Sequence, residues 1–120
     1  MIKFPNKKYD LEERTAIFAE KVIELCKKVS RGPINDPIVN QLVKAATSIG
    51  ANYSEANGAS SKRDFKNKIY ICKKEAKETK YWLRMLSKTV DILKEECKIL
   101  WQEAQELTLI FSKIVLNTKI

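Results

Sequence analysis

Residues 61 to 88 read SKRDFKNKIYICKKEAKETKYWLRMLSK, and wound as a helix they sort into three faces. With a turn of about 100° per residue, seven side chains fall within roughly 60° of one line. This core stripe consists of Phe65, Ile69, Cys72, Ala76, Thr79, Leu83 and Leu86. Such spacing predicts one long helix that packs against other helices.

The cations of this helix gather on one side of the stripe, which we call the basic flank. It consists of Lys62, Arg63, Lys66, Lys73, Lys74, Lys77, Lys80, Arg84 and Lys88. An ordinary solvated face is the alternative, but such a face usually mixes both signs because Glu and Lys support each other across a turn. Only Lys68 lies outside this separation of charges by sign. The separation therefore favours a nucleic-acid-binding surface.

The opposite side, the acidic-apolar flank, combines acids with large apolar residues. It holds Asp64, Ile71, Glu75, Glu78, Trp82 and Met85. A monomer would leave Ile71, Trp82 and Met85 in water, so we expect these three to form an oligomer interface.

The length and the charge of the chain fit this interpretation. The 120 residues suffice for a single domain, residues 1–120. Lys and Arg number 23 against 15 Asp and Glu, a net charge of +8, and residues 62–88 alone hold ten basic and three acidic side chains, a net +7. So localised an excess favours a polyanionic partner, either nucleic acid or an acidic protein.

Apolar periodicity and capping signals predict four helices, at about residues 11–30, 37–57, 61–88 and 94–118. Asp10, Asp36 and Ser60 or Ser61 are the expected helix starts, and Asn57-Gly58 ends the second helix. Short connections and no strand pattern predict an all-α, antiparallel, up-down-up-down four-helix bundle. Residues 1–9 are expected to form a flexible arm. Gly50, inside the second helix, suggests close approach of a neighbouring helix.

The three cysteines, Cys26, Cys72 and Cys97, are far apart and lie near apolar stripes, as buried thiols of a reducing cytoplasm would. The first residues do not resemble a signal peptide, and no stretch has the roughly 20 apolar residues of a membrane span. We therefore expect a cytoplasmic protein that does not enter a membrane.

The residue types for common catalytic sites are missing. The chain contains no histidine, and it has neither a CxxC pair nor a glycine-rich phosphate loop. Carboxylate bundles that hold two iron ions need Glu-x-x-His pairs, which a chain without histidine cannot supply. We expect no enzymatic activity, no cofactor and no metal site.

Two groups of polar residues have open alternatives. Asn52, Glu55, Glu78 and Thr79 are predicted to form a buried hydrogen-bond network between the second and third helices, the alternative being a ligand or RNA site. The tyrosines beside the basic flank, Tyr70 and Tyr81, are suited to stack on unpaired bases, and equally to cover the stems of lysines.

The run from Gln41 to Leu86 resembles the bacterial four-helix bundle family that includes proteins encoded in intervening sequences of 23S ribosomal RNA genes. The resemblance rests on Gln41-Leu42, on SIGANYSEA (residues 48–56), on Ser61, Asp64 and Phe65, and on KEAKETKYWL (residues 74–83). It implies an antiparallel bundle that assembles into rings, typically pentamers, without established enzymatic activity. More distantly, the run is similar to the accessory proteins of diversity-generating retroelements, basic pentameric bundles that bind a reverse transcriptase and nucleic acid.

Two hypotheses about function follow. The first is a non-enzymatic, ring-forming bundle that binds RNA or DNA through the basic flank. The second is a protein-interaction scaffold, or accessory subunit, that docks an acidic or nucleic-acid-bearing partner such as a reverse transcriptase.

Overall fold

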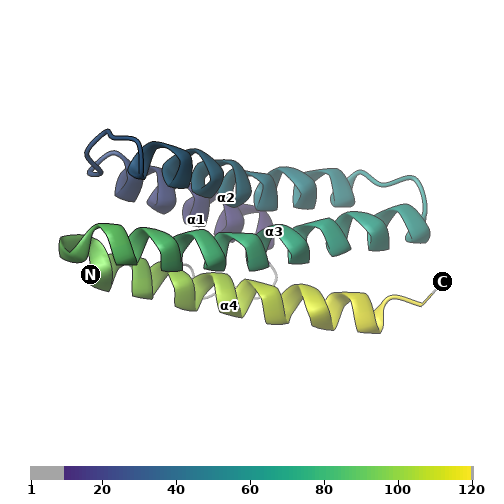
Figure 1. Ribbon diagram of the computed structural model, residues 1–120. Coiled ribbons are helices and arrows are strands. Elements are labelled where there is room, and N and C mark those ends of the chain that lie inside the picture. The colour runs from purple at the N-terminus through teal and green to yellow at the C-terminus, as the bar shows by residue number, and fades with distance from the viewer. Residues whose placement is uncertain (1–9, 120) are drawn as a thin grey trace.

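The computed structural model describes residues 10–119, and over that range the chain folds into four α-helices and one short 3-10 helix. They are α1 (Leu11–Cys26), α2 (Asn35–Asn57), α3 (Lys62–Thr89), η1 (Asp91–Leu93) and α4 (Lys94–Asn117). The chain reverses direction from each α-helix to the next (Figure 1). The predicted all-α four-helix bundle is confirmed, whereas the predicted arm lies outside the described residues.

The helix α3 is the centre of the packing. Its interfaces with α2 and with α4 are the most extensive in the bundle, while α1 packs mainly on α2 and meets α4 over a smaller area. The bundle is 46 Å in its longest dimension, close to the roughly 42 Å expected for the 28 residues of α3. Because α3 packs against two neighbouring helices, only its side turned away from the core is exposed to solvent.

The starts of α1 and α3 agree with the sequence. Asp10 accepts a hydrogen bond from the backbone N–H of Glu13 (3.2 Å), and Ser61 accepts one from that of Asp64 (3.0 Å). Each side chain thus satisfies one of the N–H groups that a helix leaves free at its beginning.

Two predicted boundaries are wrong by a few residues. The helix α1 ends at Cys26 rather than at residue 30, because the next N–H groups bond to carbonyls only three residues back, as Val29 does to Cys26. The helix α2 begins at Asn35, two residues early, so Asp36 is not its N-cap. The Asp36 carboxylate instead accepts hydrogen bonds from the Gly32 N–H and from the Arg31 guanidinium.

The core contains the predicted stripe of α3. Six of its seven residues are buried, and Phe65 is half-buried against them. Gly50 of α2 also has the expected packing reason, since a Cβ atom there would lie 3.0 Å from Oγ1 of the buried Thr15 on α1. A larger residue at position 50 would therefore push α1 away from α2.

The three cysteines are free and buried, as predicted. Burial raises the pKa of the Cys26 and Cys97 thiols to about 11 and that of Cys72 to about 12. Because the thiolate is the reactive form, these groups behave as small core side chains.

Candidate nucleic-acid interface

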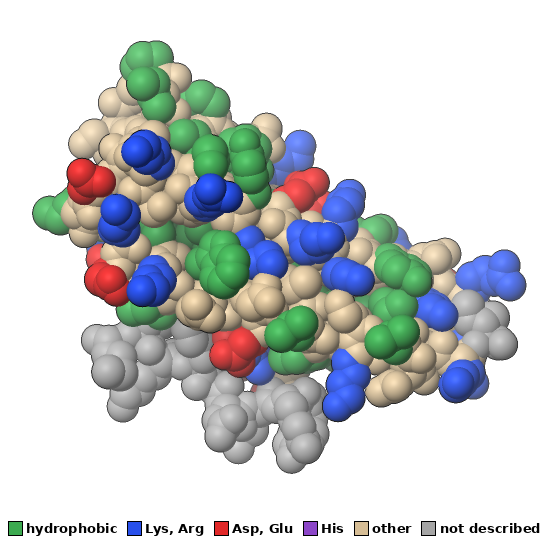
Figure 2. Space-filling model, turned by 60° about the horizontal axis from the view of Figure 1, so that its bottom comes forward, with side chains coloured by type: hydrophobic (Ala, Val, Ile, Leu, Met, Phe, Trp, Pro, Cys, Tyr) green, Lys and Arg blue, Asp and Glu red, His purple; other side chains and the backbone are tan. Residues whose placement is uncertain are grey.

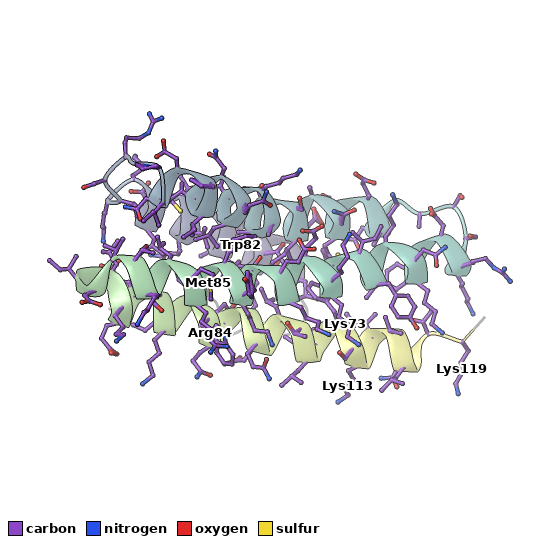
Figure 3. The ribbon with its side chains drawn as sticks, in the orientation of Figure 1. Lys73, Trp82, Arg84, Met85, Lys113 and Lys119 are labelled. Atoms are coloured by element: carbon purple, nitrogen blue, oxygen red, sulfur yellow. The ribbon has the colours of Figure 1, made fainter. Side chains whose placement is uncertain are left out.

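The two flanks of α3 face different neighbours. On the basic flank, Lys80 donates a hydrogen bond to Gln105 of α4. On the other side, Lys68 donates to Glu55 of α2 at 2.7 Å. Figure 3 agrees, with Arg84 and Lys73 toward α4 and Trp82 toward α2. The basic flank therefore borders α4, and the acidic-apolar flank borders α2.

Most of the basic flank is open to water and lacks a counter-charge. Six of the nine side chains are exposed, while Lys66, Lys73 and Lys80 are half-buried. Within residues 10–119, one member of the flank forms an ion pair: Lys74 lies 3.6 Å from a carboxylate oxygen of Glu75. The flank is thus a strip of cations available to a polyanion.

Lys80 is the member with a clear structural role. Besides its bond to Gln105, its ammonium lies 5.2 Å from the centre of the Trp101 ring, within the range of a cation–π contact. Lys80 thereby fixes α3 to α4 and is the least available of the nine for an external ligand.

Lys68, which departs from the sorting by sign, is explained by its partner. The hydrogen bond that it donates to Glu55 is the main cause that raises the pKa of Lys68. This cation belongs to the α2–α3 interface, so it is correctly separated from the basic flank.

The basic surface continues onto α4, which the sequence argument missed. Lys94, Lys98 and Lys113 are exposed on this helix, and Figure 3 places Lys113 below Lys73 of α3. Figure 2 shows the side of the molecule formed by α3 and α4, where Lys and Arg outweigh Asp and Glu and apolar side chains lie between them. Plotting the sequence of α4 on a helical wheel would have placed these cations on one face. It could not have shown that this face lies beside the basic flank of α3.

The two tyrosines beside the basic flank border a shallow hollow on the outer side of α3. Its volume is about 470 Å³. It is lined by Tyr70, Lys73, Lys74, Lys77, Glu78 and Tyr81. Both tyrosine rings are about half exposed, so each keeps surface available to a ligand.

The three residues predicted as an oligomer interface, Ile71, Trp82 and Met85, are each half-buried in the single chain. Trp82 already packs against the core, and Tyr81 meets it edge-on with ring centres 4.9 Å apart. The apolar surface left for a partner is therefore smaller than the sequence suggested.

The structure does not bring together the four residues of the predicted buried network. Thr79 is buried but donates to the Glu75 carbonyl of its own helix, and the Asn52 amide donates to Ser48 of α2. Glu55 and Glu78 are exposed. A carbonyl one turn back in the same helix thus satisfies Asn52 and Thr79, so neither side chain needs a partner across the α2–α3 interface.

The buried polar contact of the core is instead an ion pair between α1 and α4. Arg14 donates to both carboxylate oxygens of Glu103 at 2.7 and 2.8 Å, and to the exposed Glu106 at 2.9 Å. The side chains of Arg14 and Glu103 are only 10% and 4% exposed. Their hydrogen bonds hold the pKa of Arg14 above its ordinary high value.

A sequence signal for this pair existed. Arg14 falls between Leu11 and Phe18 on the apolar stripe of α1, and Glu103 lies beside Ala104 on that of α4. Opposite charges at core positions of two helices predict such a pair, although not that the two helices are neighbours.

Neither a metal-binding cluster nor a membrane-spanning helix occurs among the described residues. Over residues 10–119, no three His, Cys, Asp or Glu side chains come together in a way that could hold a metal ion. None of the helices there combines the length and apolar character needed to cross a membrane.

The fold and this surface define a small four-helix bundle with a cationic side formed by two of its helices. The chain belongs to the family of 23S rRNA-intervening sequence proteins, whose family model matches residues 7–113. No curated protein matches the chain.

Among the solved structures that are similar to this chain, one matches it over most of its length. It is the crystal structure of a protein with unknown function from the S23 ribosomal protein family of Bacteroides thetaiotaomicron, similar to this chain with a TM-score of 0.76 and 32% sequence identity. The match covers 88% of this chain and 97% of that one.

Proposed function

We propose that this protein is a non-enzymatic bundle that assembles into a ring and binds nucleic acid, RNA or DNA, through the basic flank of α3. The observation that carries the proposal is the strip of cations along the border of α3 and α4, of which only Lys74 forms an ion pair within residues 10–119. On the α2 side of α3, by contrast, Lys68 is paired with Glu55. Around a ring, this strip would be repeated once per subunit. The free, buried thiols support a cytoplasmic setting.

Fluorescence anisotropy with labelled RNA and duplex DNA, over a range of salt concentrations, tests the binding. Each neutralised phosphate contributes about −0.9 to the slope of log affinity against log salt for duplex DNA and about −0.7 for single strands. Replacing Lys66, Lys73, Lys77 and Arg84 together with glutamine should weaken binding to all sequences. The slope should flatten by up to about 3.6 for duplex DNA and about 2.8 for single strands.

A matched control has the same net charge but loses its cations elsewhere. Glutamine at Lys21, Lys27, Arg31 and Lys44 removes four cations from α1, α2 and their connection. This control should keep most of the affinity and the slope. An equal loss of affinity in both quadruple variants would show that only net charge matters. If the natural protein binds neither RNA nor DNA at low salt, the proposal is refuted.

Ring formation through the acidic-apolar flank needs its own test. Met85→Glu is more informative than Trp82→Glu, because Trp82 also packs against the core of its own chain. A charge on that interface should shift the assembly toward monomer in light scattering with unchanged helicity. A natural protein that is already monomeric at micromolar concentration would contradict the ring.

The hollow between Tyr70 and Tyr81 favours a second candidate, the docking of an acidic protein partner. Aromatic rings beside lysines suit an acidic peptide with apolar side chains as well as they suit nucleic acid. If neither RNA nor DNA binds at low salt, a scaffold that docks a protein partner such as a reverse transcriptase becomes the better-supported function.

A further inference from the structure

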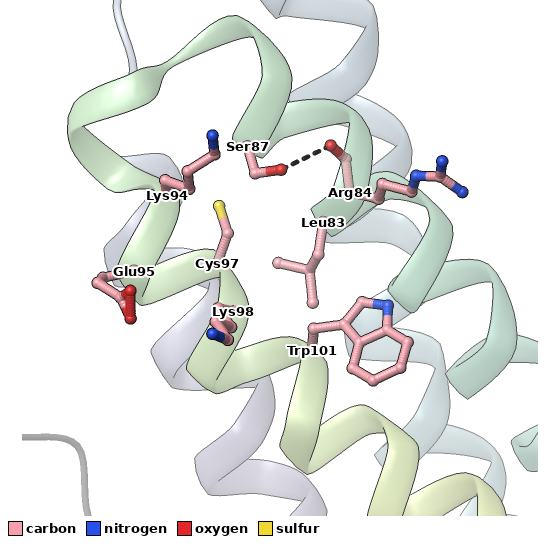
Figure 4. Close-up of a pocket in the computed structure, with 8 residues that line it drawn as sticks. All are labelled: Leu83, Arg84, Ser87, Lys94, Glu95, Cys97, Lys98 and Trp101. Carbon is pink, nitrogen blue, oxygen red and sulfur yellow. Dashed lines mark hydrogen bonds between the residues drawn. The ribbon is translucent and has the colours of Figure 1, made fainter.

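The hollow between the second half of α3 and the first half of α4 combines cationic side chains with an aromatic ring (Figure 4). Its volume is about 380 Å³, inside the range of roughly 300–1,000 Å³ typical of small-molecule sites. It is lined by Leu83, Arg84, Ser87, Lys94, Glu95, Cys97, Lys98 and Trp101. Unlike the hollow beside Tyr70, it draws on two helices and has a floor of core residues.

The rim of this hollow is cationic. Arg84 comes from α3, and Lys94 and Lys98 come from α4. Within residues 10–119, none of these three forms an ion pair, and Glu95 is the only acid that lines the hollow. Three cations against one anion leave a net positive rim, which suits a phosphate group.

The floor and one wall are apolar and fixed. Leu83 and Cys97 are almost fully buried, and Trp101 is half-buried beside them. Lys80 lies over the Trp101 ring and is itself held by Gln105, so the indole is positioned before any ligand arrives. An aromatic wall above an apolar floor suits a flat ring, and base–aromatic stacking contributes substantially to the binding of single strands.

The hollow is continuous with the basic flank. Arg84 belongs to both the flank and the hollow. A neighbouring hollow of about 410 Å³ is also lined by Arg84, together with Lys88 and Lys94. We propose that a nucleic-acid strand follows the basic flank and places one unpaired nucleotide in the hollow, with its base against Trp101 and the phosphates on either side of it near Arg84, Lys94 and Lys98. This inference rests on the proposed function and adds that an unpaired nucleotide is preferred, because bases in a duplex have no free face.

The test compares a single-stranded RNA with a duplex that contains the same strand. Single strands should quench the tryptophan emission of the natural protein, and the quenching should disappear in Trp101→Phe. Trp101→Leu should bind the single strand at least about fivefold more weakly, with the duplex affinity changed less than twofold, whereas Trp101→Phe retains most of the affinity. Circular dichroism melting checks that both variants are folded.

A charge-matched pair of variants tests the rim. Lys94→Gln combined with Lys98→Gln should reduce the preference for the single strand, whereas Lys27→Gln combined with Lys44→Gln, on other helices, should not. If nucleic acid binds with a steep salt dependence but folded Trp101→Leu binds single strands normally, the proposed function stands and this inference is wrong. Quenching that depends on protein concentration alone would show a second copy in the hollow and would also overturn it.

Discussion

On the side of α4 that faces α1, Arg14 and Glu103 form a buried ion pair, whereas on the side that faces α3 most cations have no ion-pair partner within residues 10–119. Arg14 and Glu103 meet through two hydrogen bonds within the core. Arg84, Lys94 and Lys98 instead surround an open hollow. A buried charge must be paired, whereas an exposed charge need not be. The paired charges therefore stabilise the fold, and the exposed ones remain available to a ligand.

The largest effect should come from breaking the buried pair. Arg14→Met leaves the Glu103 carboxylate in the core without its partner, and we expect the free energy of unfolding to fall by about 3–5 kcal/mol in urea denaturation. The cause is the desolvated charge and not a loss of packing, because methionine fills much of the same space.

Two further variants check that cause. Arg14→Met combined with Glu103→Leu should recover most of the loss, since an apolar pair can replace a buried ion pair at little cost. Arg31→Met, which removes the exposed pair with Asp36, should leave the urea midpoint essentially unchanged, because the Arg31 side chain is 91% exposed. A comparable loss from both arginine replacements would mean that burial does not distinguish the pairs.

An intermediate effect is expected at the α2–α3 interface, where the polar side chains of Asn52 and Thr79 bond within their own helices. Asn52→Leu removes an amide that donates only to Ser48, and leucine is the better helix former. The free energy of unfolding should therefore change by less than about 1 kcal/mol, as measured by thermal melting. A larger loss, or a changed oligomer in sedimentation, would show that Asn52 has a partner in another copy.

The smallest effect on stability should come from the basic flank itself. Glutamine at Lys66, Lys73, Lys77 and Arg84 should change the free energy of unfolding by no more than about 0.5 kcal/mol, because these cations form no ion pair within residues 10–119. Urea denaturation at low and high salt measures it. A large loss of stability would place these residues in the fold and remove the contrast between the two sides of α4.

The sequence by itself determined the helices, the core stripe of α3 and the separation of its charges. These follow from a repeat of 3.6 residues and from capping side chains, which act over one or two turns. Thus Ser61 begins α3 as expected, and Ile69 and Leu83 are buried as expected. The end of α1 and the start of α2 were predicted wrongly by a few residues, because the competing hydrogen bonds in the turn between them are equally local.

Only the tertiary structure decided which helix faces which flank. The arrangement of the four helices brings Trp101 and Lys98 of α4 beside Arg84 of α3, although residues 84 and 101 lie 17 positions apart in the chain. It also joins Arg14 to Glu103, and it leaves Thr79 to bond within its own helix. Periodicity places a side chain on one face of its helix, but the partner of that face is set by how the whole core packs together.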